Sequence, residues 1–583
     1  MQNREVFRPW VVVLSLMIIL GIFAARCLQT ARAYSVTSDE GFHVSSSLHF
    51  WMTGDDLGMW QAGVPRLPHL INTSVPYLVL RQAGLPPVPS PEPTGFLWGL
   101  LSDDKNTVIL PVRRMAIGWG ILALLVTYWA VARTCGAALG LVAAALLSMV
   151  PEMLAHSSRA GPDVPCATAM FIALLTLARY VERPSLFRWV AMALAIGLAW
   201  AMRHNAILLI PLAVGASLWV AFRQPRPSGV FAIGKRLGGT ACSSVALVAI
   251  AFAVLWASDG LKTIPLGSED NPARRLRTIR NLGPLDVSRL PLPTSLLSLR
   301  YQLAHAMYGH PAYFCGELDN GGWMLYFPVA FLLKTPIGLL ILIILATVRV
   351  RPRGALDWIL LGCLVLLWIA LVCNKIDIGL RYALLCYALI MPFIARLFEK
   401  SLLRDRIWGP ITIAATLFLV WESVICHPQY LSSFNQLGGG SRLGWLYLAD
   451  SNLDWGQDID ALAAELKKQG IEEITTTGMW GWRTLALAGI RAMLADEKSH
   501  SDLVKGPTPP SRRLHYTDGS YQTIRTRYIA VGVNSMLGLK MVGFDKLSVY
   551  ELRWLWTRRL VKRVNDSILI FDMDRPAETP FFL

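Results

Sequence analysis

The sequence has little charge for its length: only 16% of its 583 residues are Asp, Glu, Lys or Arg, whereas 54% are hydrophobic. This balance excludes a soluble globular protein of ordinary composition, in which about a quarter of the residues are charged. The mean hydropathy of +0.44 agrees with this. The chain is therefore expected to sit in a bilayer.

The sequence also lacks the marks of a zinc-stabilised or nucleic-acid-binding protein. None of the nine cysteines forms a CxxC pair or a Cys/His cluster with zinc spacing, and most lie in or beside apolar segments, as free buried thiols do. The net charge is +16, but the basic residues punctuate long apolar runs and do not gather on one surface. The positive charge therefore indicates how the chain is oriented in the membrane, and no nucleic-acid partner is expected.

About eleven apolar windows are long enough, or nearly so, to cross a bilayer as helices, which takes about 20 residues each. They lie at about 10–28, 115–132, 136–150, 164–180, 187–202, 206–222, 238–257, 323–348, 358–373, 380–395 and 408–426. The sequence thus predicts a mainly α, polytopic membrane protein whose transmembrane module spans residues 1–426.

Basic residues decide the predicted orientation, because Lys and Arg in short loops resist translocation. With a cytoplasmic N-terminus, the inside segments hold many basic residues and the short outside turns hold few. Those few are Arg159, Arg203, Lys375 and Arg381. The asymmetry predicts two exported loops, at about 29–114 and 258–322, and an exported segment from 427 onward. The first window is also open to interpretation as a cleaved signal peptide, because its end resembles a small-residue cleavage site.

The segment 427–583 changes character, with more charge and short β-like runs. Four runs are typical of strands: 446–449, 474–477, 528–533 and 567–571. The run 458–468 is typical of an amphipathic helix. This alternation predicts a small exported C-terminal α/β domain. Segment 450–458 superficially resembles a calcium loop, but Trp455 and Ala461 stand where such a loop needs Gly and Glu, so we expect a strand-to-helix turn.

Two adjacent acids, Asp39 and Glu40, follow the first window by about ten residues in the run TSDEGFH. A glycosyl acceptor hydroxyl must lose its proton as it attacks an anomeric carbon, so carboxylates at an exported membrane surface are candidate general bases. A helix N-cap or a solvated loop explains the same pair without catalysis. The two residues alone leave these interpretations open.

A third acid, Asp163, ends the short outside turn PEMLAHSSRAGPD. The length of the turn keeps Asp163 near the membrane surface, where the first-loop acids can meet it, one acid acting as base and another positioning substrate or metal. A cap on the following helix is compatible with that role. Asp39 and Asp163 are the candidate ligands if a divalent cation, Mg²⁺ or Mn²⁺, takes part. Their spacing does not distinguish a metal clamp from a general base, and no other cofactor is predicted.

Cations form the second group of candidates. Lys334 lies in the middle of an apolar window, which costs roughly 2.5 to 3.5 kcal/mol on insertion scales and calls for a partner. A lipid phosphate and the embedded Glu422 are the two alternatives. Arg381 and Tyr382 follow an outer turn, so Arg381 is a candidate for phosphate binding at the headgroup level. Arg203 is a further cation, for which anchoring at the interface is the alternative.

The order of several motifs resembles a known superfamily, the lipid-carrier-dependent glycosyltransferases of GT-C type, which includes protein O-mannosyltransferases and bacterial aminoarabinose transferases. The motifs are SDEGFH with TGD, PEMLAHSSRAGPD, YFPVAFLLKTP and GLRYALLCYALIMPF. A later block, YLSSFNQLGGG followed by YLADSNLDWGQDI, is similar to that of bacterial membrane proteins in the same group. Together these runs are spread over most of the chain, from residue 38 to residue 459.

The resemblance implies an inverting sugar transfer from a polyprenyl-phosphate donor, with Asp39 as the first choice for base, Glu40 as the second, and Asp163 as a further acidic position. It implies substrate-binding roles for His43, His156, Arg203, Lys334, Arg381 and Tyr382. Where members often have His-Pro-Pro-Leu, this chain has PRLPHL (65–70), which puts donor or acceptor preference in doubt. The resemblance also implies a bacterial inner membrane, with the C-terminal domain in the periplasm or outside the cell.

The function expected from these observations is transfer of a sugar to a protein, lipid or glycan hydroxyl on the exported membrane face. The cytoplasmic loops are too short for a nucleotide-binding domain, which favours a donor carried by lipid. A transporter or flippase of lipid-linked sugars is the alternative from another class, and it predicts paired halves and interrupted helices. A non-catalytic assembly subunit is a third. The sugar, the acceptor, the oligomeric state and the role of the C-terminal domain do not follow from the sequence.

Overall fold

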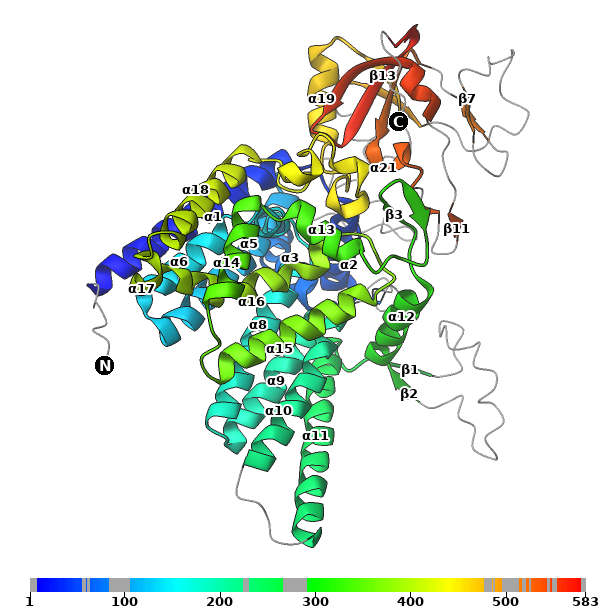
Figure 1. Ribbon diagram of the computed structural model, residues 1–583. Coiled ribbons are helices and arrows are strands. Elements are labelled where there is room, and N and C mark those ends of the chain that lie inside the picture. The colour runs from blue at the N-terminus through cyan, green and yellow to red at the C-terminus, as the bar shows by residue number, and fades with distance from the viewer. Residues whose placement is uncertain are drawn as a thin grey trace.

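The computed structural model describes residues 8–54, 59, 63–82, 105–223, 230–265, 291–476, 485, 488–494, 513–515, 521–523, 526–539, 541–542, 546–547 and 553–577. Most of the first 426 residues form a helical bundle, and a smaller mixed module follows it at one end (Figure 1). The predicted fold class, a mainly α membrane protein with a C-terminal α/β part, is confirmed.

Every predicted window is helical. By length and composition, the described residues hold eight candidate spans. They comprise α1 (Pro9–Ala33), α5 (Ile109–Cys135), α8 (Asp163–Glu182), α10 (Leu209–Arg223) with the preceding turn η2 (His204–Leu208), α11 (Val230–Ser258), α15 (Ala355–Val372), α16 (Leu384–Ala395) with η6 (Leu380–Ala383), and α18 (Trp408–Ile425). The other three windows are two bent helix pairs and the shorter apolar helix α9 (Leu186–Met202).

The two bent pairs each break at a proline. Helix α6 (Ala137–Ser148) meets α7 (Pro151–Ser157) at 72°, and α13 (Tyr326–Lys334) meets α14 (Ile337–Arg349) at 113°. Proline lacks an N–H and drives the preceding residue to extended backbone, as at Thr335, where ψ is 129°. Each pair is therefore a broken span or a re-entrant segment.

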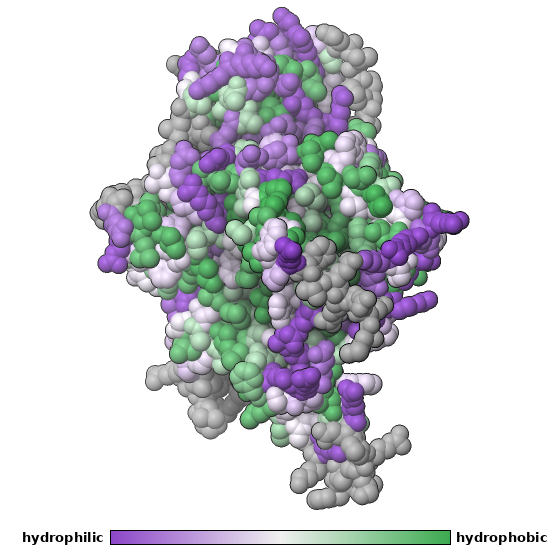
Figure 2. Space-filling view, turned by 90° about the vertical axis from the view of Figure 1, so that its left-hand side faces the viewer, coloured by the Kyte–Doolittle hydropathy of each residue, from purple (hydrophilic) through white to green (hydrophobic). Residues whose placement is uncertain are grey.

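Burial separates central from lipid-facing helices. The apolar window of α16 is 89% buried within the protein and that of α8 is 78% buried, whereas that of α1 is only 11% buried. Large apolar side chains of α1 such as Trp10, Met17 and Ile22 are exposed, as on a surface that meets acyl chains. Hydrophobic side chains gather over the middle of the face in Figure 2, and hydrophilic ones cover its upper part.

Short elements of the predicted exported loops lie beside the bundle. Two helices, α2 (Ser38–Thr53) and α3 (Leu67–Gln82), come from the first loop. The second loop and its continuation give β1 (Thr263–Pro265) paired antiparallel with β2 (Pro291–Pro293), α12 (Thr294–Tyr308), and β3 (Ala312–Phe314) paired antiparallel with β4 (Glu317–Asp319). The short helix α17 (Lys400–Leu403) lies at the opposite end, before α18 (Figure 1).

The C-terminal module is built on a mixed five-stranded sheet in the order β12-β13-β9-β5-β6. Its strands are β5 (Glu473–Thr476), β6 (Arg491–Leu494), β9 (Tyr528–Gly532), β12 (Arg558–Val564) and β13 (Ile568–Pro576). Strand β5 pairs in parallel with β6 and β9, and β13 pairs antiparallel with β9 and β12. Apolar residues of α19 (Ile459–Lys468) join those of the sheet in one core, which holds the module together. The remaining described strands and α-helix of the module are β7 (Arg513–His515), β8 (Tyr521–Thr523), α21 (Val533–Met536), β10 (Met541–Val542) and β11 (Lys546–Leu547).

Three of the four predicted strands are confirmed, as β5, β9 and β13, and the predicted helix is α19. The strand predicted at 446–449 is wrong. A 3₁₀ turn (Gly444–Leu446) occupies its start, and Leu448 makes only an isolated bridge to Phe314 of β3. The apolar side chains that suggested a strand are instead buried against the bundle, where Leu448 and Trp445 join the main core.

Candidate functional site

The two acids after the first span have different environments. Thr37 and Glu40 form a capping box at the start of α2: Glu40 accepts from the Thr37 backbone N and from its hydroxyl, both at 3.1 Å. Arg113 of α5 donates to both Glu40 oxygens, at 2.9 and 2.7 Å, and the Ala160 amide donates at 2.9 Å. Glu40 and Arg113 are fully buried. The helix-cap interpretation therefore fits Glu40, whose oxygens are occupied by structural donors.

Asp39 is the carboxylate that remains accessible, since its side chain is 35% exposed. Arg381, at the start of the buried α16 span, donates from Nη1 to Asp39 Oδ2 at 2.6 Å. Burial raises the pKa of Asp39, but Arg381, His43 and Arg159 together lower it to about 2. Asp39 is therefore ionised at neutral pH and oriented by one charge-assisted hydrogen bond.

Asp163 belongs to the same charge network through a second arginine. It is the first residue of α8 and forms an ion pair with Arg203 at the end of α9. The Arg203 guanidinium lies 4.5 Å from the Tyr382 ring, and Arg381 lies 5.5 Å from that ring. The structure thus links Asp39, Arg381, Tyr382, Arg203 and Asp163 in one continuous chain of contacts, as the sequence predicted for residues from distant segments.

The predicted histidines lie in different surroundings. The His43 ring stacks on His69 of α3, with centroids 3.9 Å apart, and both are buried. Burial lowers the pKa of His43 to about 4 and that of His69 as well, so both are neutral at pH 7. His156 instead contacts Glu152 at 3.2 Å and Arg159 at 2.6 Å, beneath the turn.

Lys334 does not contact the Asp39 network. Its ammonium donates to Leu431 O at 2.7 Å and Asn452 O at 2.5 Å, and it pairs with Glu152 at 2.9 Å. These three acceptors match the three hydrogens of an ammonium group and leave none for a phosphate.

The alternative pairing of Lys334 with Glu422 is wrong. The Glu422 oxygens accept from the backbone N of Ile337 and of Gly338, both at 2.9 Å. Glu422 therefore caps the start of α14 from another helix. The residue at the N-cap of α14 itself, Pro336, makes no side-chain cap. The proline break that exposes these N–H groups explains why the carboxylate lies there.

The donor set does not fit a metal held by several protein ligands. Among the residues that the structure describes, no three His, Cys, Asp or Glu side chains gather as metal ligands do. Asp163 is paired with Arg203 and one oxygen of Asp39 with Arg381, so guanidinium groups occupy the positions next to the two candidate carboxylates.

Several residues of the site were not predicted, because their roles depend on partners from distant segments. Arg113 and Glu152 bind other site residues in the interior, and Trp455 lies under Arg159 and Arg381. Asp450 is a second acid coupled electrostatically to Asp39. Its burial raises its pKa to about 7, although Arg381 opposes this. Glu152, Asp450 and Trp455 lie in the motifs that resemble the superfamily, but the position of a residue along the chain does not reveal which side chains it contacts.

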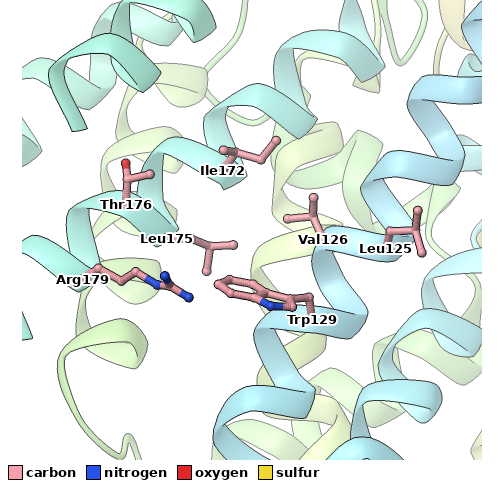
Figure 3. A pocket seen from close by; sticks show the side chains of 7 residues that line it. All are labelled: Leu125, Val126, Trp129, Ile172, Leu175, Thr176 and Arg179. Atoms are coloured by element: carbon pink, nitrogen blue, oxygen red, sulfur yellow. The ribbon is translucent and has the colours of Figure 1, made fainter. Parts of the chain in front are cut away.

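A groove elsewhere on the bundle holds none of the predicted site residues. It lies between α5 and α8, where Leu125, Val126, Trp129, Ile172, Leu175, Thr176 and Arg179 line it (Figure 3). Arg179 lies 4.6 Å from the Trp129 ring. Its mainly apolar lining, between two candidate spans, is typical of a surface that contacts lipid.

Comparison with known proteins supports the resemblance seen in the sequence. Residues 101–256 match the family model for dolichyl-phosphate-mannose-protein mannosyltransferase. That range contains the turn with Glu152, Arg159 and Asp163 and also Arg203. The predicted resemblance to lipid-carrier-dependent glycosyltransferases is thereby confirmed over this part of the chain. No curated protein matches the chain by sequence.

Solved structures of similar shape are distant in sequence. ArnT from Cupriavidus metallidurans, bound to undecaprenyl phosphate, is 13% identical with a TM-score of 0.44, and the match covers 97% of this chain and 98% of that one. The Archaeoglobus fulgidus oligosaccharyltransferase in its apo form is 12% identical with a TM-score of 0.39, over 82% of this chain and 64% of that one. These likenesses are too distant to assign a donor or an acceptor.

Proposed function

We propose that this protein is an inverting glycosyltransferase that moves a sugar from a polyprenyl-phosphate donor to a protein, lipid or glycan hydroxyl on the exported membrane face. The observation that carries the proposal is the Asp39–Arg381 pair: an ionised, partly exposed carboxylate held at 2.6 Å by an arginine at the start of a buried span. A base for the acceptor and a cation for the leaving phosphate thus lie side by side.

In the proposed reaction, Asp39 takes the proton of the acceptor hydroxyl as its oxygen attacks the anomeric carbon. The new C–O bond forms on the face opposite the phosphate, the bond from that carbon to the phosphate oxygen breaks, and polyprenyl phosphate leaves with the electron pair. Arg381 compensates the charge that develops on the leaving oxygen. Among the residues that the structure describes, its buried Nε has no hydrogen-bond partner, which leaves one N–H donor for that oxygen.

Other predicted residues complete the proposed site. Arg203 adds a second cation beside Tyr382, and Asp163 orients it through their ion pair. His43 offers a neutral imidazole near Asp39, suited to hydrogen bonding with a sugar hydroxyl. We assign Lys334 and His156 to support of the surrounding turns, because their partners are protein groups.

Transport of a lipid-linked sugar is the second candidate, and one observation favours it. Both bent helix pairs carry charge beside their breaks, with Glu152 on α7 and Lys334 on α13, and interrupted helices are typical of transporter sites. These two groups, however, neutralise each other in the interior. They therefore offer a substrate no free charge, and transfer accounts better for the accessible Asp39.

The experiment that separates the two candidates uses the purified full-length protein in liposomes. Polyprenyl-phosphate hexoses, each labelled in the sugar, are supplied one at a time, with nucleotide sugars as parallel donors. We expect label to leave the carrier only when a polyprenyl-phosphate donor is present, with free polyprenyl phosphate as the second product. Movement of intact donor across the bilayer with no transfer would support transport instead, and transfer from a nucleotide sugar would contradict the proposed donor.

A further inference from the structure

The segment 450–458 leaves the C-terminal module and is fixed to the helical bundle by hydrogen bonds. Asn452 accounts for most of them: its Oδ1 accepts from Leu380 N at 2.9 Å, its Nδ2 donates to the Tyr326 hydroxyl at 2.8 Å, and its carbonyl accepts from Lys334 at 2.5 Å. Ser451 N donates to Ile378 O at 3.2 Å. These contacts fix the segment against the backbone that precedes Arg381.

The same segment also holds the start of α2. Ser38 N donates to Trp455 O at 3.2 Å, and Ser35 N donates to Gln457 O at 2.7 Å. The Gln457 side chain closes the turn by accepting from Trp455 N at 2.7 Å and donating to Leu453 O at 2.8 Å. Asp39 follows Ser38 directly, so the carbonyl of Trp455 sets the backbone that presents the candidate base.

The Trp455 ring contacts two arginines of the charge network around the base. Arg159 lies 3.9 Å from the ring centroid and Arg381 lies 4.2 Å from it, while Trp455 is only 9% exposed. Two guanidinium groups brought this close repel each other, and an aromatic face attracts both. Arg159 also interacts electrostatically with Asp39 and Glu40. Trp455 therefore contacts the backbone of Ser38, next to the base, through its carbonyl, and Arg381, the arginine paired with the base, through its ring.

We propose that Trp455 is a positioning residue that fixes the Asp39–Arg381 geometry, and that the C-terminal module completes the active site in this way. That Trp455 affects catalysis rests on the proposed function. That Trp455 fixes the positions of Asp39 and Arg381 does not depend on it. The residue acts through Asp39 and Arg381 and need not touch substrate. Segment 450–458, predicted only as a turn, thereby acquires a defined role.

The test uses full-length protein in detergent, with Trp455→Leu to remove the aromatic face and Trp455→Phe to retain one. Trp445→Leu is the matched control, because Trp445 is also buried, belongs to the same core as Trp455 and lies under Arg563 at 5.7 Å, but among the described residues it makes no ring contact with Arg159 or Arg381. The probe is undecaprenyl phosphate. We expect Trp455→Leu to weaken its binding about tenfold or more, with Trp455→Phe and Trp445→Leu within about threefold of the wild type.

Hydrogen exchange gives a second readout that needs no substrate. Trp455→Leu should speed amide exchange at least about tenfold at residues 35–41 and 378–383, while the two other variants leave these segments unchanged. Unchanged exchange there would overturn the positioning role whatever the function is. If the wild type fails to bind undecaprenyl phosphate but the exchange pattern appears, the proposed function fails and the positioning role stands.

Discussion

At the scale of single residues, neighbours determine what each acid can do. Glu40 and Asp39 are adjacent, yet Glu40 is enclosed by Arg113, Thr37 and the Ala160 amide, whereas Asp39 has one arginine and an accessible oxygen. A carboxylate whose oxygens are occupied is a poor base, since the acceptor proton cannot reach it. We therefore propose Asp39 as the base, whereas Glu40 caps the helix.

The low pKa of Asp39 leads to a prediction on pH. With a pKa of about 2, Asp39 is deprotonated throughout pH 5 to 8, so it should add no acid limb to kcat/KM in the wild type. In Arg381→Met, burial is no longer offset by that guanidinium and the pKa of Asp39 rises. A larger fraction is then protonated as pH falls, so activity should drop toward pH 5. Arg527→Met, which breaks the Arg527–Asp572 pair in the C-terminal module, is the control. If kcat/KM varied with pH in the same way in Arg381→Met and Arg527→Met, the proposed role of Arg381 would be contradicted.

A second prediction concerns Lys334. Because Lys334 and Glu152 are buried together, Lys334→Met leaves a buried carboxylate without its cation, which should cost about 3–5 kcal/mol of stability. The double variant Lys334→Met, Glu152→Gln should recover part of the loss. Thermal unfolding in detergent measures both. If Lys334→Met unfolds at the wild-type temperature and only weakens donor binding, Lys334 serves the phosphate after all.

At the scale of secondary-structure elements, close helix contacts depend on small residues. A Cβ added at Gly338 in α14 would lie 2.4 Å from Ala415 O and from Leu419 N, both backbone atoms of α18. Gly338→Ala must therefore push the helices apart and should cost about 1–3 kcal/mol. Gly118→Ala in α5 is the matched control, because nothing lies within 4 Å of its added Cβ. Equal melting temperatures for the two variants would show that the α14–α18 contact is looser than described.

Elements were predictable from the sequence to the extent that their signal is local. The helices follow from apolar windows, and α19 from its amphipathic pattern. The 113° bend between α13 and α14 was missed, because a window average ignores the proline at 336. The run 446–449 looked like a strand because buried apolar residues in an irregular turn have the same composition as a short strand.

The pairing of side chains was the part that the sequence could not determine. Glu422 and Glu152 both lie within or beside apolar windows, and only the packed bundle decides that Lys334 meets Glu152. Trp455 was noticed only as a misfit in a calcium loop, since its two arginine partners lie about 75 and 300 residues earlier in the chain. By contrast, the convergence of Asp39 and Arg381 was predicted, because topology assigns both to one membrane face.

At the scale of the whole molecule, the predicted topology puts the β3–β4 hairpin and the C-terminal module outside. Cys315 lies in this hairpin and is exposed. A membrane-impermeant maleimide added to intact cells should therefore label the peptide that contains Cys315, as measured by mass spectrometry. Cys315→Ser is the control for that signal. Labelling only after the cells are opened would invert the topology and move the proposed reaction to the cytoplasmic face.

The most direct test of the central claim is sugar transfer from a labelled polyprenyl-phosphate donor by the wild type, Asp39→Asn and Asp460→Asn. Asp460 is a partly exposed acid that pairs with Lys105 and has no part in the proposed reaction. The account predicts labelled acceptor and free polyprenyl phosphate from the wild type and Asp460→Asn, and a loss of at least about a hundredfold in Asp39→Asn while the protein stays folded. Full transfer by folded Asp39→Asn would contradict the account.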